Sequence, residues 1–199
     1  MPGHGDTGRE RHIICMKWGK KYGPEYVNRL YAMVRRHLTG DFRFVCLTDD
    51  NTGIRSEVQC LPIPPLDLPP GIPERGWTKL ASFAQDLHGL RGTALFLDVD
   101  VVIVGSMDGF FEVPGDFMII HDYKRPWRIT GNSSVYRYEL GAHPDVLEYF
   151  RKNFESIRKQ ALQSTKIDLP KVKFLPFEPQ GTLQIDPTAH FVLLKQEQE

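Results

Sequence analysis

Apolar residues occur along the chain in runs that alternate with stretches of helical spacing. Residues 12–18, 42–47 and 93–104 are largely apolar, which is typical of strands that are buried on both faces. Between the first two runs, apolar side chains recur at the spacing of a helix face, at Val27, Leu30, Tyr31, Val34 and Leu38. The pattern therefore predicts a strand, a helix and a second strand in the first 50 residues or so.

The later part of the chain continues this alternation. Further helices are predicted over residues 77–87 and within 143–157, and shorter strands over 58–61, 117–120 and 134–138. Alternating strands and helices predict an α/β fold, in which helices cover a mostly parallel central sheet in three layers. Ligands of such sheets bind beyond the carboxyl ends of the strands, so residues that carry chemistry are expected just after the apolar runs.

Two carboxylates, Asp98 and Asp100, interrupt the strongest apolar run at positions i and i+2. Alternation along a strand places both on one face. Two like charges in apolar surroundings are costly, and a divalent cation removes that cost. Hard oxygen ligands select Mn²⁺ or Mg²⁺, so the sequence predicts a metal site at this pair. The competing interpretation is that the strand ends near Leu97 and that both aspartates are solvated turn residues.

Aromatic and polar residues also follow the first two predicted strands. Lys17, Trp18 and Tyr22 follow the first strand, where aromatic rings can stack on a nucleobase and lysines can reach phosphates. Thr48 and Asp49 follow the second strand, where an acidic group can bond a base or a ribose hydroxyl. Ordinary packing, or an Asx-type turn, explains the same residues equally well, so these loops are supporting signals only.

A third group of candidates lies later in the chain. Lys79 lies off the apolar face of its predicted helix, where its charge can neutralise a diphosphate. His121 and Asp122 follow one predicted strand, and Asn132 and Ser133 precede the next, with groups that suit sugar hydroxyls. Together with the acidic pair, the sequence gives as candidate catalytic residues Asp98, Asp100, His121 and Asp122.

Composition narrows the possible functions. The 25 Lys and Arg balance the 25 Asp and Glu, so no global charge attracts nucleic acid or an anionic membrane. The three cysteines form no C-x-x-C pair that would indicate zinc. No apolar run approaches the roughly 20 residues of a transmembrane segment. Residues 1–11 lack the apolar core of a signal peptide, so we predict a disordered leader on a cytoplasmic protein.

Taken in order, five segments of the chain resemble bacterial nucleotide-sugar glycosyltransferases of the GT-A type, close to family 8. They are MKWGKKYGPEYVNRLYAMVRRHL, FRFVCLTDD, RGWTKLASF, ALFLDVDVVIVG and GNSSVYRY, and they cover about residues 12 to 155. The resemblance implies a GT-A, Rossmann-like domain over residues 12–159. It also implies a nucleotide-sugar donor, most simply a UDP-sugar, and an acceptor that the sequence does not identify.

The resemblance also implies roles for individual residues. In this family the D-x-D pair binds Mn²⁺, which bridges the two donor phosphates, and this role falls to Asp98 and Asp100. The implied donor-binding residues are Lys17, Trp18 and Tyr22 for the nucleoside, Lys79 for the diphosphate, and Asn132 and Ser133 for the sugar.

The resemblance fails in the last part of the chain. Relatives carry a late histidine in an H-G-K-P-like segment that completes the metal site, and His190 here stands in the unrelated sequence AHFV. We therefore expect residues 160–199 to be a diverged or truncated segment. Two alternatives stay open: a phosphatase of the haloacid dehalogenase type with Asp98 as nucleophile and Asp100 as general acid, and a non-catalytic donor-binding remnant.

Overall fold

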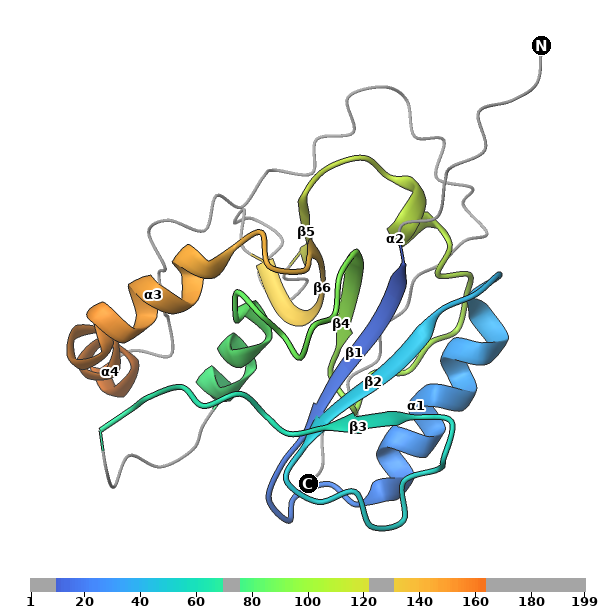
Figure 1. Ribbon diagram of the computed structural model, residues 1–199, viewed down its shortest axis with the longest axis horizontal. Coiled ribbons are helices and arrows are strands. Elements are labelled where there is room, and N and C mark those ends of the chain that lie inside the picture. Colours follow the sequence, from blue (N-terminus) through green and yellow to red (C-terminus); the bar gives the residue numbers. More distant parts are fainter. Residues whose placement is uncertain (1–9, 70–75, 122–130, 164–199) are drawn as a thin grey trace.

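A single six-stranded sheet organises the chain, in the order β3-β2-β1-β4-β6-β5 (Figure 1). The computed structural model describes residues 10–69, 76–121 and 131–163. The first four strands run parallel, and β6 runs antiparallel to both β4 and β5. The strands are β1 (Arg11–Lys17), β2 (Arg43–Thr48), β3 (Gln59–Leu61), β4 (Thr93–Leu97), β5 (Phe117–His121) and β6 (Gly131–Glu139).

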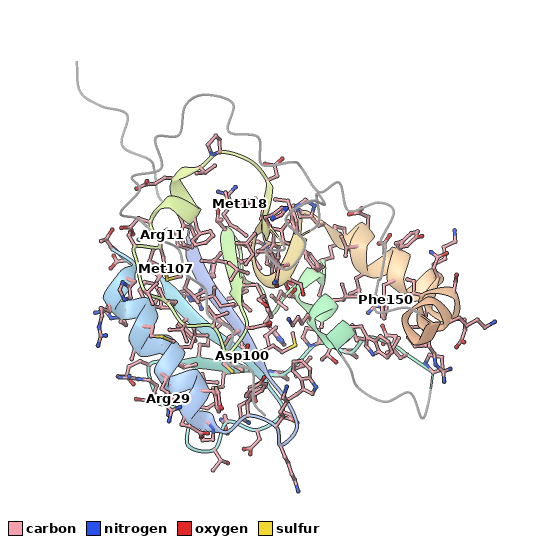
Figure 2. All side chains as sticks on the ribbon, turned by 180° about the vertical axis from the view of Figure 1, so that it is seen from behind. Arg11, Arg29, Asp100, Met107, Met118 and Phe150 are labelled. Carbon is pink, nitrogen blue, oxygen red and sulfur yellow. The ribbon has the colours of Figure 1, made fainter. Side chains whose placement is uncertain are left out.

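Helices cover both faces of the sheet (Figure 1). They are α1 (Pro24–His37), the 3₁₀ helix η1 (Gly76–Phe83), α2 (Gly109–Glu112), α3 (Pro144–Lys152) and α4 (Phe154–Gln163). Side chains of β1 alternate between the two faces: Ile13 packs in the cluster that contains α1, and Ile14 packs in the cluster that contains η1, α3 and α4. In Figure 2, Arg29 of α1 and Phe150 of α3 accordingly lie on opposite sides of the sheet. The predicted three-layer α/β fold with a mostly parallel sheet is confirmed.

Helix α1 forms where the sequence pattern predicts it. Pro24 stands in its first turn, where a missing N–H costs nothing, and the helix ends before Gly40, which adopts a φ of +72°. Val27, Leu30 and Val34 are fully buried against the sheet. Burial of each such side chain contributes about 1.5–3 kcal/mol, so the apolar stripe fixes which face of α1 meets the strands.

Several predicted boundaries are wrong. The strand predicted to reach residue 104 ends at Leu97, because the chain turns there, with the Val101 N–H donating to the Asp98 carbonyl. The helix predicted over residues 77–87 is a short 3₁₀ helix. The helix predicted within 143–157 is divided at Asn153, whose side-chain amide donates to the Tyr149 carbonyl.

The described residues cover most of the predicted domain. β1 begins at Arg11, one residue before the predicted domain start, and α4 continues to Gln163, beyond the predicted end at residue 159. Most of the predicted leader, and residues 164–199 of the predicted C-terminal segment, lie outside the described residues. Within the described ranges, no helix has the length and apolar character needed to cross a membrane.

Candidate functional site

The polar residues singled out in the sequence lie along one edge of the sheet. Strands β1, β2 and β4 are parallel, so their carboxyl ends reach the same edge, and antiparallel β6 begins there. In Figure 2, Asp100 accordingly lies at the end of the sheet opposite Arg11, the first residue of β1. This is the edge at which ligands bind in open α/β sheets.

Asp98 is partly buried and forms an ion pair with Lys79. The Lys79 Nζ lies 2.6 Å from Asp98 Oδ1 and 2.7 Å from Oδ2, so the ammonium contacts both carboxylate oxygens. The two side chains are only 20% and 13% exposed. Nζ also donates to the Ser133 carbonyl at 3.5 Å. Lys79 therefore joins η1 to the end of β4 and the start of β6.

Asp100 has a different partner. Its side chain is buried, and the Tyr22 hydroxyl donates to Oδ2 at 2.9 Å. Burial is the main cause that raises the pKa of Tyr22, so the phenol keeps its proton at neutral pH and remains a donor. Lys21 lies over the Tyr22 ring, 4.8 Å from its centroid, and adds positive charge to this side of the site. Each aspartate is thus held by its own polar partner.

The local structure of the acidic pair differs in part from what the sequence pattern predicted. The strand ends at Leu97, and the Val101 N–H bonds the Asp98 carbonyl across a turn, as the competing interpretation required. The aspartates are nevertheless shielded from solvent, which solvated turn residues would not be. The pair is a shielded acidic turn at the edge of the sheet.

These two aspartates supply the hard oxygen ligands that Mn²⁺ or Mg²⁺ prefers. The described residues contain no cluster of three or more His, Cys, Asp or Glu side chains that could hold a metal ion alone. The pair therefore suits a cation that takes its remaining ligands from phosphate oxygens and water, which is how Mg²⁺-type sites bind substrate phosphates.

A pocket of about 540 Å³ lies at the same edge of the sheet. Its walls are Trp18, the end of β2 at Thr48 and Asp49, residues 62–69, and the start of η1 at Trp77 and Thr78. The Thr78 hydroxyl is buried and has no hydrogen-bond partner among the described residues. Since Thr78 precedes Lys79, the pocket adjoins the Asp98 ion pair. Its size and its mixture of aromatic and polar groups suit a small ligand.

Two of these walls were not predicted as binding residues. Trp77 packs edge-on against Phe154 with ring centroids 5.8 Å apart, and it also lines the pocket. The place of residues 62–69 directly after β3, at the carboxyl edge of the sheet, is the signal that could have identified them.

The loop after β1 reaches the end of β2. Gly19 adopts a φ of +63°, and its N–H donates to Asp49 Oδ2 at 2.9 Å. Lys17 is buried, and its Nζ donates to the Asp50 carbonyl at 3.1 Å. The Lys17 ammonium thus closes the loop after β2, whereas the Asp49 carboxylate lines the pocket.

The remaining predicted site residues lie on the antiparallel side of the sheet. Asn132 and Ser133 fall inside β6, which begins three residues earlier than predicted, and Asn132 Oδ1 accepts the Ser134 N–H. Ser133 is at the site through its carbonyl contact with Lys79. His121 is the exposed last residue of β5, one strand farther from β4. Asp122 lies outside the described residues.

The Tyr22 hydrogen bond gives a first prediction. Tyr22→Phe removes the donor to the buried Asp100 carboxylate, and we expect the free energy of unfolding to fall by about 1 kcal/mol. Tyr31→Phe, on α1, is the matched control, because the Tyr31 hydroxyl makes no hydrogen bond among the described residues. Urea unfolding of the two variants tests this prediction. An equal fall in the free energy of unfolding for both variants would show that the Tyr22–Asp100 hydrogen bond does not stabilise the fold.

The comparisons with known proteins identify the fold. No family model matches the chain, and no curated protein matches its sequence. The apo form of the glycosyltransferase GlyE from Streptococcus pneumoniae TIGR4 matches with a TM-score of 0.54 and 15% identity, over 79% of this chain and 40% of GlyE. A second GlyE structure matches with a TM-score of 0.55 and 12% identity, over 78% of this chain and 40% of GlyE. An active-site mutant of LgtC matches with a TM-score of 0.48 and 14% identity, over 79% of this chain and 65% of LgtC.

The two GlyE matches place the chain among GT-A, Rossmann-like structures. The likeness to GlyE concerns the fold, since the sequences are 12–15% identical. The chain spans 40% of the length of GlyE and 65% of the length of LgtC. The predicted GT-A fold is therefore confirmed.

Proposed function

We propose that this chain is a glycosyltransferase that uses a nucleoside diphosphate sugar, most simply a UDP-sugar, with Mn²⁺ or Mg²⁺ at Asp98 and Asp100. One observation carries the proposal: the shielded acidic turn adjoins an aromatic pocket at the carboxyl edge of a GT-A sheet. A nucleoside diphosphate has the matching arrangement, with an aromatic base at one end and a charged diphosphate at the other. The acceptor is not specified by these features.

The pocket would hold the nucleoside half of the donor. Trp18 and Trp77 offer ring surfaces for the base, since aromatic stacking tolerates any base and contributes about 1–3 kcal/mol. Asp49 can accept an N–H of the base or a ribose hydroxyl. The buried Thr78 hydroxyl gains the partner that it lacks among the described residues.

The acidic turn would hold the diphosphate half. A divalent cation bound there would neutralise charge on the departing diphosphate. Lys79 already contacts Asp98 and the Ser133 carbonyl, so its positive charge lies where a phosphate oxygen would bind. Tyr22 keeps Asp100 in place through its hydroxyl. These contacts preorganise the site, so little rearrangement is needed when the donor binds.

The phosphatase alternative loses support from the fold. The acidic turn follows the fourth strand of a GT-A sheet, beside antiparallel β6, whereas the phosphatase motif normally opens its domain. The binding-only remnant shares the proposed site and differs only in turnover.

We also propose a cytoplasmic location. Cys15 and Cys46 are neighbours in the register of β1 and β2, fully buried and free. Buried free thiols are typical of proteins in reducing compartments. Expression of the chain with a fluorescent tag, followed by cell fractionation, tests this part of the proposal.

A thermal-shift screen of nucleotide sugars with and without Mn²⁺ tests the function. A ligand at a hundredfold excess over its dissociation constant stabilises the folded state by about 2.7 kcal/mol, so a specific donor should raise the melting temperature clearly. We expect the rise only when Mn²⁺ and a nucleoside diphosphate sugar are both present. Hydrolysis of p-nitrophenyl phosphate, without a response to any nucleotide sugar, would favour the phosphatase.

A further inference from the structure

Residues 62–69 form one wall of the pocket and have no regular secondary structure. Four of these residues are prolines, which have no N–H to donate: Pro62, Pro64, Pro65 and Pro69. At these four positions the wall cannot pair with a neighbouring strand through a backbone N–H as β3 does. The wall is held by the packing of its own Ile63, Leu66 and Leu68 against the core, and by side chains that reach it from elsewhere.

Two side chains from outside the wall hold its carbonyl groups. His88 Nε2 lies 2.7 Å from the Pro62 carbonyl oxygen. Arg151, in the last turn of α3, donates from Nε to the Leu66 carbonyl at 3.2 Å and from Nη2 to the Pro65 carbonyl at 3.1 Å. The wall is thus attached at its start and near its centre.

The Arg151 guanidinium also holds a bend in the wall. Its Nη2 lies 2.6 Å from Asp67 Oδ2, and Asp67 adopts a φ of +54°. This left-handed conformation is uncommon for residues other than glycine, although aspartate tolerates it better than most. The planar guanidinium donates several hydrogen bonds in a fixed geometry, so Arg151 fits this one conformation of Pro65, Leu66 and Asp67.

Helix α3 also contacts another residue that lines the pocket. Phe150, next to Arg151, is 1% exposed, and its ring centroid lies 6.4 Å from that of Trp77. Trp77 lines the pocket as well. Arg151 therefore extends to the wall from a helix whose buried face packs against a second part of the pocket lining.

We propose that Arg151, with His88, is a positioning residue that fixes the proline-rich wall and thereby controls how tightly the nucleoside half of the donor binds. The inference rests on the proposed function, which supplies the nucleoside as the occupant of the pocket. Arg151 and Asp67 are 37% and 62% exposed, and ion pairs this open contribute little to global stability. Loss of Arg151 should therefore change ligand affinity without unfolding the chain.

Isothermal titration of UDP and of inorganic pyrophosphate, both with Mn²⁺, tests the proposal. We expect Arg151→Ala to weaken UDP about tenfold, equivalent to about 1.4 kcal/mol, and to leave pyrophosphate within about twofold of wild type. Arg151→Lys should recover only part of the UDP affinity, since an ammonium cannot reproduce the guanidinium geometry. His88→Ala should also weaken UDP and leave pyrophosphate unchanged, with a smaller effect on UDP than Arg151→Ala.

Arg158→Ala is the matched control, because Arg158 is a similarly exposed arginine on α4 that pairs with Glu155 at 3.7 Å. Arg158→Ala should change neither the affinity for UDP nor the affinity for pyrophosphate. Unchanged UDP affinity in Arg151→Ala, or equal weakening of UDP and pyrophosphate, would overturn the positioning role alone. If the wild-type chain binds neither ligand, the proposed function fails and this inference fails with it.

Discussion

Asp98→Asn is expected to abolish Mn²⁺-dependent binding of a nucleoside diphosphate and to destabilise the free chain. A neutral amide is a poor ligand for a hard cation, so the metal loses one of its two protein carboxylates. The change also leaves the Lys79 ammonium, 20% exposed, without its carboxylate partner. We expect the free energy of unfolding to fall by about 1–3 kcal/mol. Titration calorimetry with UDP and Mn²⁺, and urea unfolding without ligand, measure the two effects.

Two further variants sharpen this test. Asp100→Asn should lose metal-dependent binding as well, but should cost less stability, because an amide oxygen can still accept the Tyr22 hydroxyl. Asp86→Asn is the control for a change of charge, since Asp86 is 70% exposed and pairs with Arg91 away from the acidic turn. An Asp98→Asn chain that binds UDP with Mn²⁺ as tightly as wild type would remove the basis of the metal assignment.

Lys79→Ala is expected to weaken UDP by roughly ten- to a hundredfold and uridine hardly at all. The ammonium lies between Asp98 and Ser133, where the diphosphate should bind, and a charge-assisted hydrogen bond contributes about 1.5–3 kcal/mol. The free variant should also lose stability, because Asp98 would keep a shielded charge without its partner. Added Mn²⁺ should restore part of that loss by replacing the missing positive charge.

The measurement is a pair of titrations, with UDP and with uridine, combined with thermal unfolding at increasing Mn²⁺. Lys152→Ala, which removes an exposed lysine from the last turn of α3, serves as the control for loss of charge. Equal weakening of uridine and UDP would place Lys79 outside the diphosphate site. If Mn²⁺ does not change the melting temperature of Lys79→Ala, Asp98 does not bind the cation.

The sequence predicted the layers of the fold well, because β1, α1 and β2 have clean periodicity and clear end signals. It failed after Leu97 for a physical reason. Val99, Val101 and Ile103 are apolar because this irregular segment packs in the same buried cluster as α1. A buried loop and a buried strand have the same composition, so composition and alternation could not locate the end of β4.

The sequence named candidate site residues but not the contacts between them. Asp98 pairs with a lysine 19 positions away, and Asp100 with a tyrosine 78 positions away. The sequence suggested two crowded like charges, whereas each carboxylate has its own partner in the fold. The pocket wall at residues 62–69 was missed for the same reason, since the order of the strands in the sheet brings it to the same pocket as Trp18.

Electron paramagnetic resonance of Mn²⁺ tests the central claim most directly, because the spectrum of free aqueous Mn²⁺ is reduced when the ion binds. The ion would be titrated with the chain, with UDP, and with both. We predict that the chain and UDP together remove far more free Mn²⁺ than the sum of their separate effects, and that Asp98→Asn abolishes this excess. A free-ion signal that the wild-type chain leaves unchanged in the presence of UDP would contradict a donor site built on Asp98 and Asp100.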